Sequence, residues 1–312
     1  MIKELENKED QLHQIYVLTQ KYHPYSPDAG SYEVFRTNYT LFMNHDRVRV
    51  LTAYQNDQIV AVFLPMSLEG MSMGMIQTVV SAECPRSFID ELLTQSIDYL
   101  KGYGLALTQI IGRDLDPSDY LQVIEDKGFV LKDQSFLSEY PCHQAIPQRF
   151  LDKKESFYQQ DRGQCLTLDE LKIHDPEWKR NWYEFEQTTL LDVPSEIPME
   201  KMRFEDWEET SFSRITPDHC VLFLMIHHQI VGLINALKSG NVYFIEFTGV
   251  AADYRRQGFS SLLKVELIHH AQKEGITAIR TMNHQANPMY GLNQAFGFKL
   301  LETQKAYALE LK

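Results

Sequence analysis

Two spacings of hydrophobic residues run through this chain. Some segments repeat apolar side chains every three to four residues, which is typical of helices with one buried face, and others alternate as strands do. This mixture predicts an α/β fold built on a mixed sheet. In the N-terminal half the predicted helices cover residues 9–22, 31–44, 86–101 and 118–127, and the predicted strands cover residues 48–54, 59–64, 73–80, 107–111 and 137–142.

The C-terminal half repeats this order. Ile59 and Gly128 are 69 positions apart in the first half, and Ile230 and Gly297 are 67 positions apart in the second. We interpret the match as two copies of one unit, although any two α/β domains of this size would share a similar order. The second half is predicted to contain helices over 178–189 and near 204–207, strands over 221–226, 230–237 and 242–250, and then helix, strand, helix and strand up to residue 311.

The boundary between the copies is expected within residues 143–165. Pro147 and a polar run at residues 159–163 interrupt the hydrophobic pattern there. The full length of 312 residues is enough for two domains of ordinary size. We therefore predict two domains, residues 1–145 and residues 146–312.

The most informative stretch is the turn between the strand ending at Val250 and the helix that follows. Gly258 lies where this helix begins, after Arg255 and Arg256. The first amides of a helix have no internal partner and point outward with the positive end of the helix dipole, so the turn can bind an anion. Gly258 lets that anion approach the backbone. The alternative is a basic helix start that only packs against a sheet.

Composition narrows the possible functions. The formal net charge is −13, from 30 Lys and Arg against 43 Asp and Glu, which argues against a broad nucleic-acid surface but leaves room for a local basic loop. No stretch has the length and apolar character of a membrane span, and the start shows no apolar signal region. The four cysteines form no C-x-x-C pair and are expected to be free thiols. We expect a cytoplasmic protein, and the sequence does not indicate its oligomeric state.

Two pairs of adjacent histidines, His227-His228 and His269-His270, raise the question of a metal site. His227 and His228 are adjacent, so on a strand they would point to opposite faces. His270 shares a helix face with Glu266, but two ligands are too few for a closed site. We expect no metal cofactor.

The turn also resembles a known family. The run Arg255-Arg256-Gln257-Gly258-Phe259-Ser260 resembles the acyl-CoA pyrophosphate loop Q/R-x-x-G-x-G/A of the GCN5-related N-acetyltransferases, with Ser260 where Gly or Ala is usual. It follows a strand ending in Thr248-Gly249-Val250, as in that family. The later run from Asn287 through Asn293 to Gly297-Phe298 is similar to the second cofactor segment, and the chain as a whole is similar to tandem-domain acetyltransferases of the mycothiol synthase type.

The resemblance implies a fold and a cofactor. Each domain is expected to be a mostly antiparallel, twisted sheet flanked by helices. Two central strands are expected to splay apart so that the pantetheine arm of acetyl-CoA pairs with the free edge. The residues expected to contact this cofactor are Thr248, Gly249, Val250, Arg255, Arg256, Gln257, Gly258, Phe259, Ser260, Ser261, Asn283 and Asn287.

Two residues are candidates for catalysis. Glu246 lies on the same strand as Thr248 and Val250, and alternation predicts that all three share a face. Its carboxylate could take a proton from the attacking ammonium, or it could be an ordinary polar residue on an outward face. Many relatives carry a Tyr four residues before the Gly-Phe pair, where this chain has Asn293. Tyr290 could substitute as the acid, or it could be a packing residue while solvent protonates the thiolate.

The N-terminal copy lacks these features. Its corresponding loop, residues 81–86, contains no glycine. Glu83 would repel a phosphate, and Pro85 offers no amide donor. We predict that this copy does not bind CoA in the usual way and instead braces the second copy or forms a wall of the acceptor site.

These observations predict an acetyl-CoA-dependent N-acetyltransferase whose acceptor is a small-molecule amine or, alternatively, a peptide N-terminus. Asp192 and Glu196, in a segment that resembles the acceptor-side loop of the tandem relatives, would suit a cationic amine. Two other functions stay open: a non-catalytic CoA-binding regulator, and a structural partner that binds no CoA.

Overall fold

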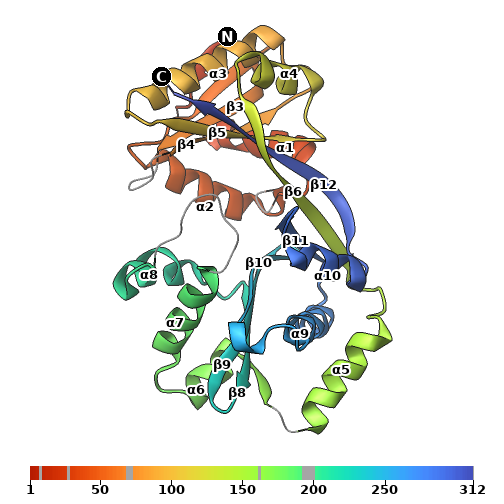
Figure 1. The fold of residues 1–312 in the computed structure, drawn as a ribbon. Helices are drawn as coiled ribbons and strands as arrows, with labels where there is room; N and C mark the ends of the chain where they lie inside the picture. The colour runs from red at the N-terminus through yellow and green to blue at the C-terminus, as the bar shows by residue number, and fades with distance from the viewer. Residues whose placement is uncertain (7–8, 27–28, 68–72, 161–162, 192–200, 312) are drawn as a thin grey trace. The chain divides into compact units, whose positions relative to one another are not determined.

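The chain forms two compact units. The computed structural model describes residues 1–6, 9–26, 29–67, 73–160, 163–191 and 201–311. The first unit comprises Met1–Leu137 together with Leu300–Lys312, and the second comprises Ser138–Lys299 (Figure 1).

The first unit contains a sheet with the strand order β1-β2-β3-β4-β5-β12. Strands β4 and β5 run parallel, and the other neighbouring pairs in this order are antiparallel. The elements are β1 (Ile2–Glu4), α1 (Glu9–Tyr22), α2 (Tyr32–Met43), β2 (Leu51–Gln55), β3 (Gln58–Ser67), β4 (Met73–Val80), α3 (Arg86–Lys101), β5 (Leu107–Arg113), α4 (Ser118–Asp126), most of β6 (Val130–Pro141), and β12 (Lys299–Glu310).

The second unit contains the strand order β11-β10-β9-β8-β7. Here β10 and β11 are parallel, and the other pairs are antiparallel. The elements are α5 (Gln148–Gln159), β7 (Gln164–Thr167), α6 (Leu168–His174), α7 (Trp178–Leu190), α8 (Phe204–Thr210), η2 (Phe212–Arg214), β8 (His219–Ile226), β9 (Gln229–Ser239), β10 (Val242–Val250), η3 (Ala252–Tyr254), α9 (Phe259–Lys273), β11 (Ala278–His284) and α10 (Pro288–Phe296).

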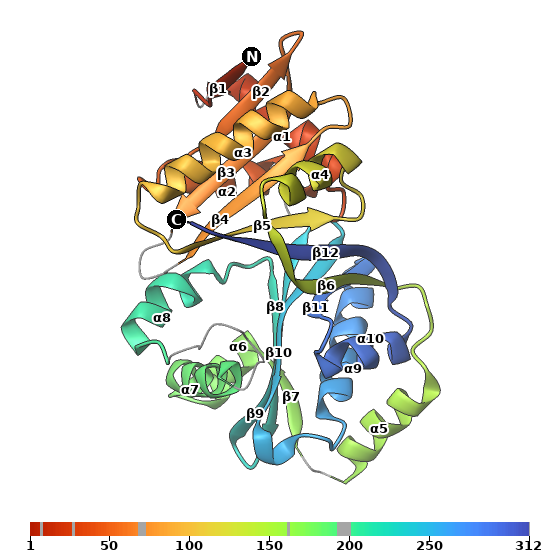
Figure 2. The same cartoon turned by 45° about the horizontal axis from the view of Figure 1, so that its top comes forward.

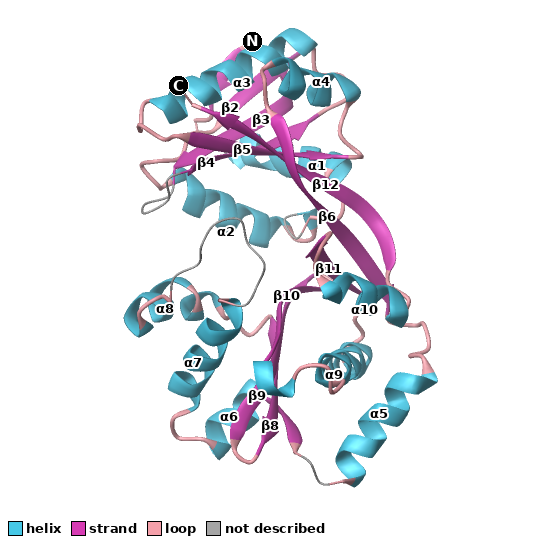
Figure 3. Ribbon diagram, viewed as in Figure 1, coloured by secondary structure: helices cyan, strands magenta, loops and turns pink. Residues whose placement is uncertain are grey.

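Helices cover both faces of each sheet, as the colouring by secondary structure shows (Figure 3). In the second unit α9 lies on one side of β8–β10, and α7 and α8 lie on the other (Figure 2). Alternate residues of β8 explain this arrangement, because Leu222 and Leu224 pack into the core with α9 while Val221 and Phe223 pack into the core with α7 and α8.

The two parallel strands of the second sheet, β10 and β11, separate part-way along. Strand β10 pairs with β11 over only four positions, from Val242 opposite Ala278 to Ile245 opposite Thr281. Beyond Ile245, the residues of β10 up to Val250 pair with β9 alone. The predicted splay is therefore present, and it leaves one edge of β10 available beside the helix α9.

Most of the predicted elements are found. The mixed α/β architecture with mostly antiparallel sheets is confirmed, and so is the matching order of elements in the two halves. The sequence pattern missed β1, α5, β7 and α6, and β6 begins at Val130 rather than at residue 137. No helix among the described residues is long and apolar enough to cross a lipid bilayer.

The division into units differs in two respects from the predicted domains, residues 1–145 and 146–312, and the first is that the second unit begins at Ser138. The second is that the last strand, β12, belongs with the first unit from Leu300 onward. The reason is its antiparallel pairing with β5, in which Tyr307 lies opposite Ile110. The predicted roles of the two parts, one non-catalytic and one catalytic, stay predictions.

Candidate functional site

The turn before α9 has the geometry of an anion-binding helix start. Gly258 caps the helix with a φ of 88°, in the left-handed region. The first bond of the helix runs from the Leu262 amide to the Gly258 carbonyl. The amides of Ser260 and Ser261 therefore have no acceptor one turn back within the helix. These backbone groups can bind a phosphate.

Basic side chains from two elements lie at this turn. The Arg255 Nε donates to the Val250 carbonyl at 3.0 Å, so part of its role is to tie the turn to the end of β10. Arg256 has a φ of 60°, which is uncommon for a residue other than glycine. Lys153, on α5, was not predicted from the sequence. Its Nζ lies 3.8 Å from the position that a Cβ on Gly258 would occupy.

Two predicted contact residues have structural roles that the motif did not reveal. Phe259 is 3% exposed, and its ring centroid lies 5.8 Å from that of Phe157 on α5. Only the backbone of Phe259 is thus placed for a cofactor contact. The Gln257 Nε2 donates to the Asp253 carbonyl at 3.2 Å, which closes the turn on itself.

Polar atoms without partners lie where β10 and β11 separate. The Thr248 Oγ1 is buried and has no hydrogen-bond partner among the described residues. The same holds for the Oδ1 of Asn293, which is fully buried and donates its Nδ2 to the Asn283 Oδ1. Asn287 caps α10, because its Oδ1 accepts from the Met289 amide at 2.9 Å. The predicted contact residues Asn283 and Asn287 are thus both engaged within the protein, whereas Asn293, in the predicted second cofactor segment, was not itself predicted as a contact residue.

Glu246 lies at a β-bulge. The register between β10 and β9 shifts between Ile245 and Phe247. The predicted common face of Glu246, Thr248 and Val250 is therefore wrong, because a bulged residue interrupts the alternation of side chains.

The Glu246 carboxylate is contacted by two side chains from neighbouring strands. The Asn235 Nδ2 donates to Oε2 at 3.3 Å, and the His219 Nε2 lies 3.3 Å from the same oxygen. Asn235 on β9 and His219 on β8 were not predicted as site residues, since only the pairing of the strands brings them to Glu246. The Glu246 side chain is 45% exposed, so a ligand can reach it from solvent.

Tyr290 lies in the first turn of α10 and is half-buried. Its amide donates to the Asn287 carbonyl at 3.0 Å. Its role as an acid stays a prediction.

The first unit differs at the equivalent places. Strands β4 and β5 also pair over only four positions, up to Ile76 opposite Ile110. The fully buried Tyr120 of α4 fills the region beyond, since its hydroxyl lies 2.7 Å from the Thr78 Oγ1 and donates to the Ile111 carbonyl at 2.9 Å. Thr78, like Thr248, lies two residues before the end of its strand. The first unit therefore satisfies internally the hydroxyl that the second leaves without a partner.

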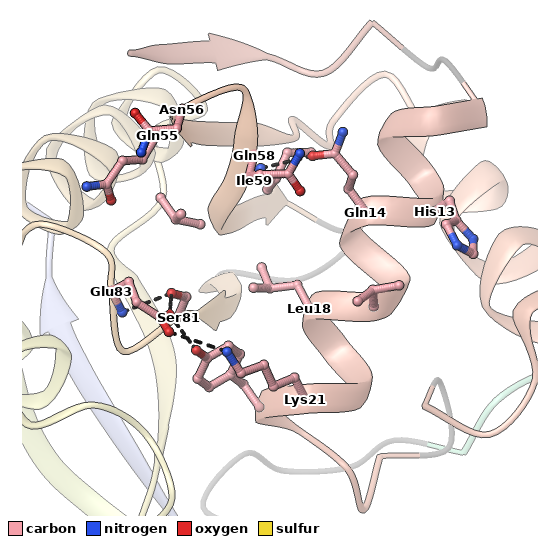
Figure 4. Close-up of a pocket in the computed structure, with 13 residues that line it drawn as sticks. His13, Gln14, Leu18, Lys21, Gln55, Asn56, Gln58, Ile59, Ser81 and Glu83 are labelled. Atoms are coloured by element: carbon pink, nitrogen blue, oxygen red, sulfur yellow. Dashed lines mark hydrogen bonds and ion pairs between the residues drawn. The ribbon is translucent and has the colours of Figure 1, made fainter.

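The loop after β4 also holds a carboxylate instead of an anion site. Glu83 accepts hydrogen bonds from Ser81, Tyr22 and Lys21. Figure 4 labels three members of this cluster, Glu83, Ser81 and Lys21. The Ser81 hydroxyl is the main cause that lowers the pKa of Glu83 to about 2. The negative charge predicted from the sequence is thus present at neutral pH.

Two hollows lie away from the turn at Gly258. One, of about 640 Å³, lies between α1 and the β2–β3 hairpin in the first unit (Figure 4). The other, of about 620 Å³, lies near the start of β8 in the second unit. No residue from 248 to 261 lines either of them.

Among the described residues no three or more His, Cys, Asp or Glu side chains are grouped as metal ligands.

Comparison with known proteins identifies the segment that carries this geometry. The model of the acetyltransferase (GNAT) family matches residues 178–298, which include β8–β11, the turn at Gly258 and both α9 and α10. Over residues 178–298 the chain is therefore similar to acetyltransferases of the GNAT family. No sequence among the curated proteins matches the chain.

Solved structures extend the likeness in fold to the whole chain. A GCN5-related N-acetyltransferase from Sphaerobacter thermophilus is 14% identical, with a TM-score of 0.70, and the match covers 100% of this chain and 96% of that one. A tandem GNAT protein from the clavulanic acid biosynthesis pathway, solved without AcCoA, is 13% identical, with a TM-score of 0.74 and coverages of 100% and 98%. At these identities the likeness shows a tandem GNAT fold. The likeness to mycothiol synthase in particular stays a prediction.

Proposed function

We propose that this protein is an acetyl-CoA-dependent N-acetyltransferase that transfers an acetyl group to a primary amine of a small molecule or, alternatively, to a peptide N-terminus. The observation that carries the proposal lies within residues 178–298, the segment that matches the GNAT family model. There β10 separates from β11 directly beside a helix start capped by Gly258 in the left-handed conformation. That combination offers an anion site for the diphosphate and a free strand edge for the pantetheine arm.

The proposed reaction is a direct attack in a ternary complex. The main-chain amides of Ser260 and Ser261, with Lys153 and Arg256 nearby, would hold the diphosphate. A backbone amide on the free edge at Thr248–Val250 would donate to the thioester oxygen as it gains charge. Each of these groups binds or polarises acetyl-CoA without forming a bond to it.

Proton transfers complete the scheme. Glu246 would accept a proton from the acceptor ammonium, and the freed amine would attack the thioester carbon. The C–S bond then breaks, the attacking nitrogen releases its second proton to solvent, and the CoA thiolate takes a proton from Tyr290 or from solvent. A cationic acceptor suits the exposed Glu246 carboxylate. Asp192 and Glu196, which would add to this preference, lie outside the described residues.

The N-terminal unit is proposed to support the catalytic unit rather than to bind a second CoA. Two features support this proposal: the Tyr120 hydroxyl is hydrogen-bonded to Thr78, and Glu83 puts a carboxylate into the loop after β4. The four cysteines form no disulfide, which suits a reducing compartment such as the cytoplasm.

The test is transfer from acetyl-CoA across a panel of primary amines, with CoA binding measured by calorimetry. We expect transfer to at least one amine and a loss of both binding and transfer in Gly258→Glu. CoA binding without transfer or hydrolysis would favour a regulator. If the wild-type protein does not bind CoA, both the enzyme and the CoA-binding regulator are excluded, and the structural partner is the function that stays open.

A further inference from the structure

We propose that His219 and Asn235 are positioning residues for Glu246, and that they hold one carboxylate oxygen so that the other is presented to the acceptor amine. This inference rests on the proposed function, because it assigns the parts of the proton-accepting group. Neither residue belongs to the turn that would bind CoA.

Both contacts converge on one oxygen. The Asn235 Nδ2 and the His219 Nε2 each lie 3.3 Å from the Glu246 Oε2. The side chain of His219 is only 6% exposed, whereas that of Glu246 is 45% exposed. The carboxylate is therefore anchored from inside the sheet while part of it remains accessible from outside.

The surroundings of His219 set which ring nitrogen carries the proton. Its Nδ1 accepts from the Thr216 amide at 3.1 Å, so Nδ1 carries no proton. The proton of the neutral ring is then on Nε2, the nitrogen that faces Glu246. His219 thus donates to the carboxylate without needing a positive charge.

The bulge in β10 makes this arrangement possible. Across the sheet Phe247, not Glu246, is the register partner of Asn235. A regular strand places neighbouring residues on opposite faces, so Glu246 and Phe247 could not both face the side of Asn235. The bulge releases Glu246 from that alternation and turns it toward Asn235 and His219.

Asn235 has a second feature that packing alone does not explain. Its Oδ1 is buried and has no hydrogen-bond partner among the described residues. A buried amide oxygen without a partner destabilises the fold, so an apolar residue of similar size would be the better choice for stability. The contact to Glu246 gives a functional reason for an asparagine at this position.

The experiment compares His219→Leu with His219→Gln, because glutamine keeps an N–H donor while leucine does not. We expect His219→Leu to lower kcat by roughly tenfold or more, with the KM for acetyl-CoA and the CoA affinity unchanged. His219→Gln should recover most of that loss. His174→Leu, which changes an exposed histidine on α6, is the matched control and should leave kcat unchanged.

A double-mutant cycle separates positioning from general destabilisation. In a Glu246→Gln background, His219→Leu should have no further effect on kcat, because the group it positions is already gone. Equal losses in both backgrounds, or no recovery by His219→Gln, would overturn the proposal.

A crystal structure of His219→Leu supplies a readout that does not depend on activity. We expect the Glu246 carboxylate to leave its position beside Asn235 or to become disordered. An unmoved carboxylate would refute the positioning role even if the protein proves not to be an enzyme. Conversely, failure of the wild-type protein to bind CoA would reject the proposed function and leave this structural test in force.

Discussion

At the scale of single residues, Gly258 has a left-handed backbone at the start of the candidate anion site. Its φ of 88° disfavours any residue with a Cβ, and that Cβ would lie 3.5 Å from the Lys153 Cδ. We expect Gly258→Ala to weaken CoA binding by about tenfold, because relaxing the strain of about 1–2 kcal/mol would move the amides that hold the diphosphate. Calorimetric titration with CoA measures the change.

Gly275 provides the matched control. It has a φ of 72°, and a Cβ there would meet no atom within 4 Å. Gly275→Ala should therefore cause a similar backbone strain at the other end of α9 while leaving the affinity for CoA unchanged. Equal affinity losses in both variants would show that the effect is one of stability and not of the turn.

Thr248 offers a second test at this scale. Because its buried Oγ1 has no partner in the protein, Thr248→Val should raise the free energy of unfolding by about 1 kcal/mol in the absence of CoA. Thr78→Val should do the opposite, since it removes the bond to Tyr120. Urea unfolding of both variants measures these signs. A loss of stability in Thr248→Val would show that its hydroxyl already has a partner.

The sequence revealed some of these residues and not others. Gly258 and its neighbours form a contiguous motif, so their shared role could be predicted from local order alone. His219, Asn235 and Glu246 are on three different strands, and only the register of the sheet brings them together. Nothing in a single sequence fixes that register to one residue.

At the scale of elements, the same limit explains the one wrong assignment of a face. The prediction for Glu246 assumed a regular strand, and β10 has a bulge at that residue. Bulges leave no reliable mark in the hydrophobic pattern, because the residues around them remain apolar. The helix α5 was missed for a related reason: only Phe150 and Phe157 are buried among its twelve residues, which is too weak a period to recognise.

Helix α9 is buried on nearly every side, and this places a lysine in the core. Lys264 is 2% exposed, and its Nζ lies 5.4 Å from the centroid of the Phe298 ring. Burial lowers the pKa of Lys264 from 10.5 to about 7. Between these two values the unfolded chain binds more protons than the folded one, so this lysine makes stability rise with pH from about 7 to about 10.5.

Replacing this lysine should therefore stabilise the protein in a pH-dependent way. We expect Lys264→Met to raise the free energy of unfolding by a few kcal/mol at pH 7, on the order of 1.4 kcal/mol per unit of pKa difference. The gain should shrink as the pH approaches 10. Urea unfolding at several pH values measures it, with the exposed Lys273→Met as control. A gain independent of pH would mean that Lys264 stays charged in the folded state.

At the scale of the whole molecule, the chain uses one order of elements twice with different contents. The repeat could be predicted because spacing and order are properties of the sequence. The pairing of β12 with β5 could not, because it joins Glu310 to Leu107 across some two hundred residues. The position of Tyr120 beyond the paired parts of β4 and β5 could not be predicted either, since a tyrosine on a helix is usually an ordinary core residue.

This difference between the units predicts how many CoA molecules one chain binds. In the second unit the region beyond the paired parts of β10 and β11 adjoins a turn with free amides, whereas in the first Tyr120 fills the corresponding region. Calorimetry with CoA should therefore give one site per chain.

Gly258→Glu should abolish this site, because the new carboxylate would stand in the anion site. Glu83→Gln, a change of one charge in the loop of the first unit, should leave one site of unchanged affinity. Two sites in the wild-type protein, or one site surviving in Gly258→Glu, would assign cofactor binding to the first unit and reverse the proposed roles.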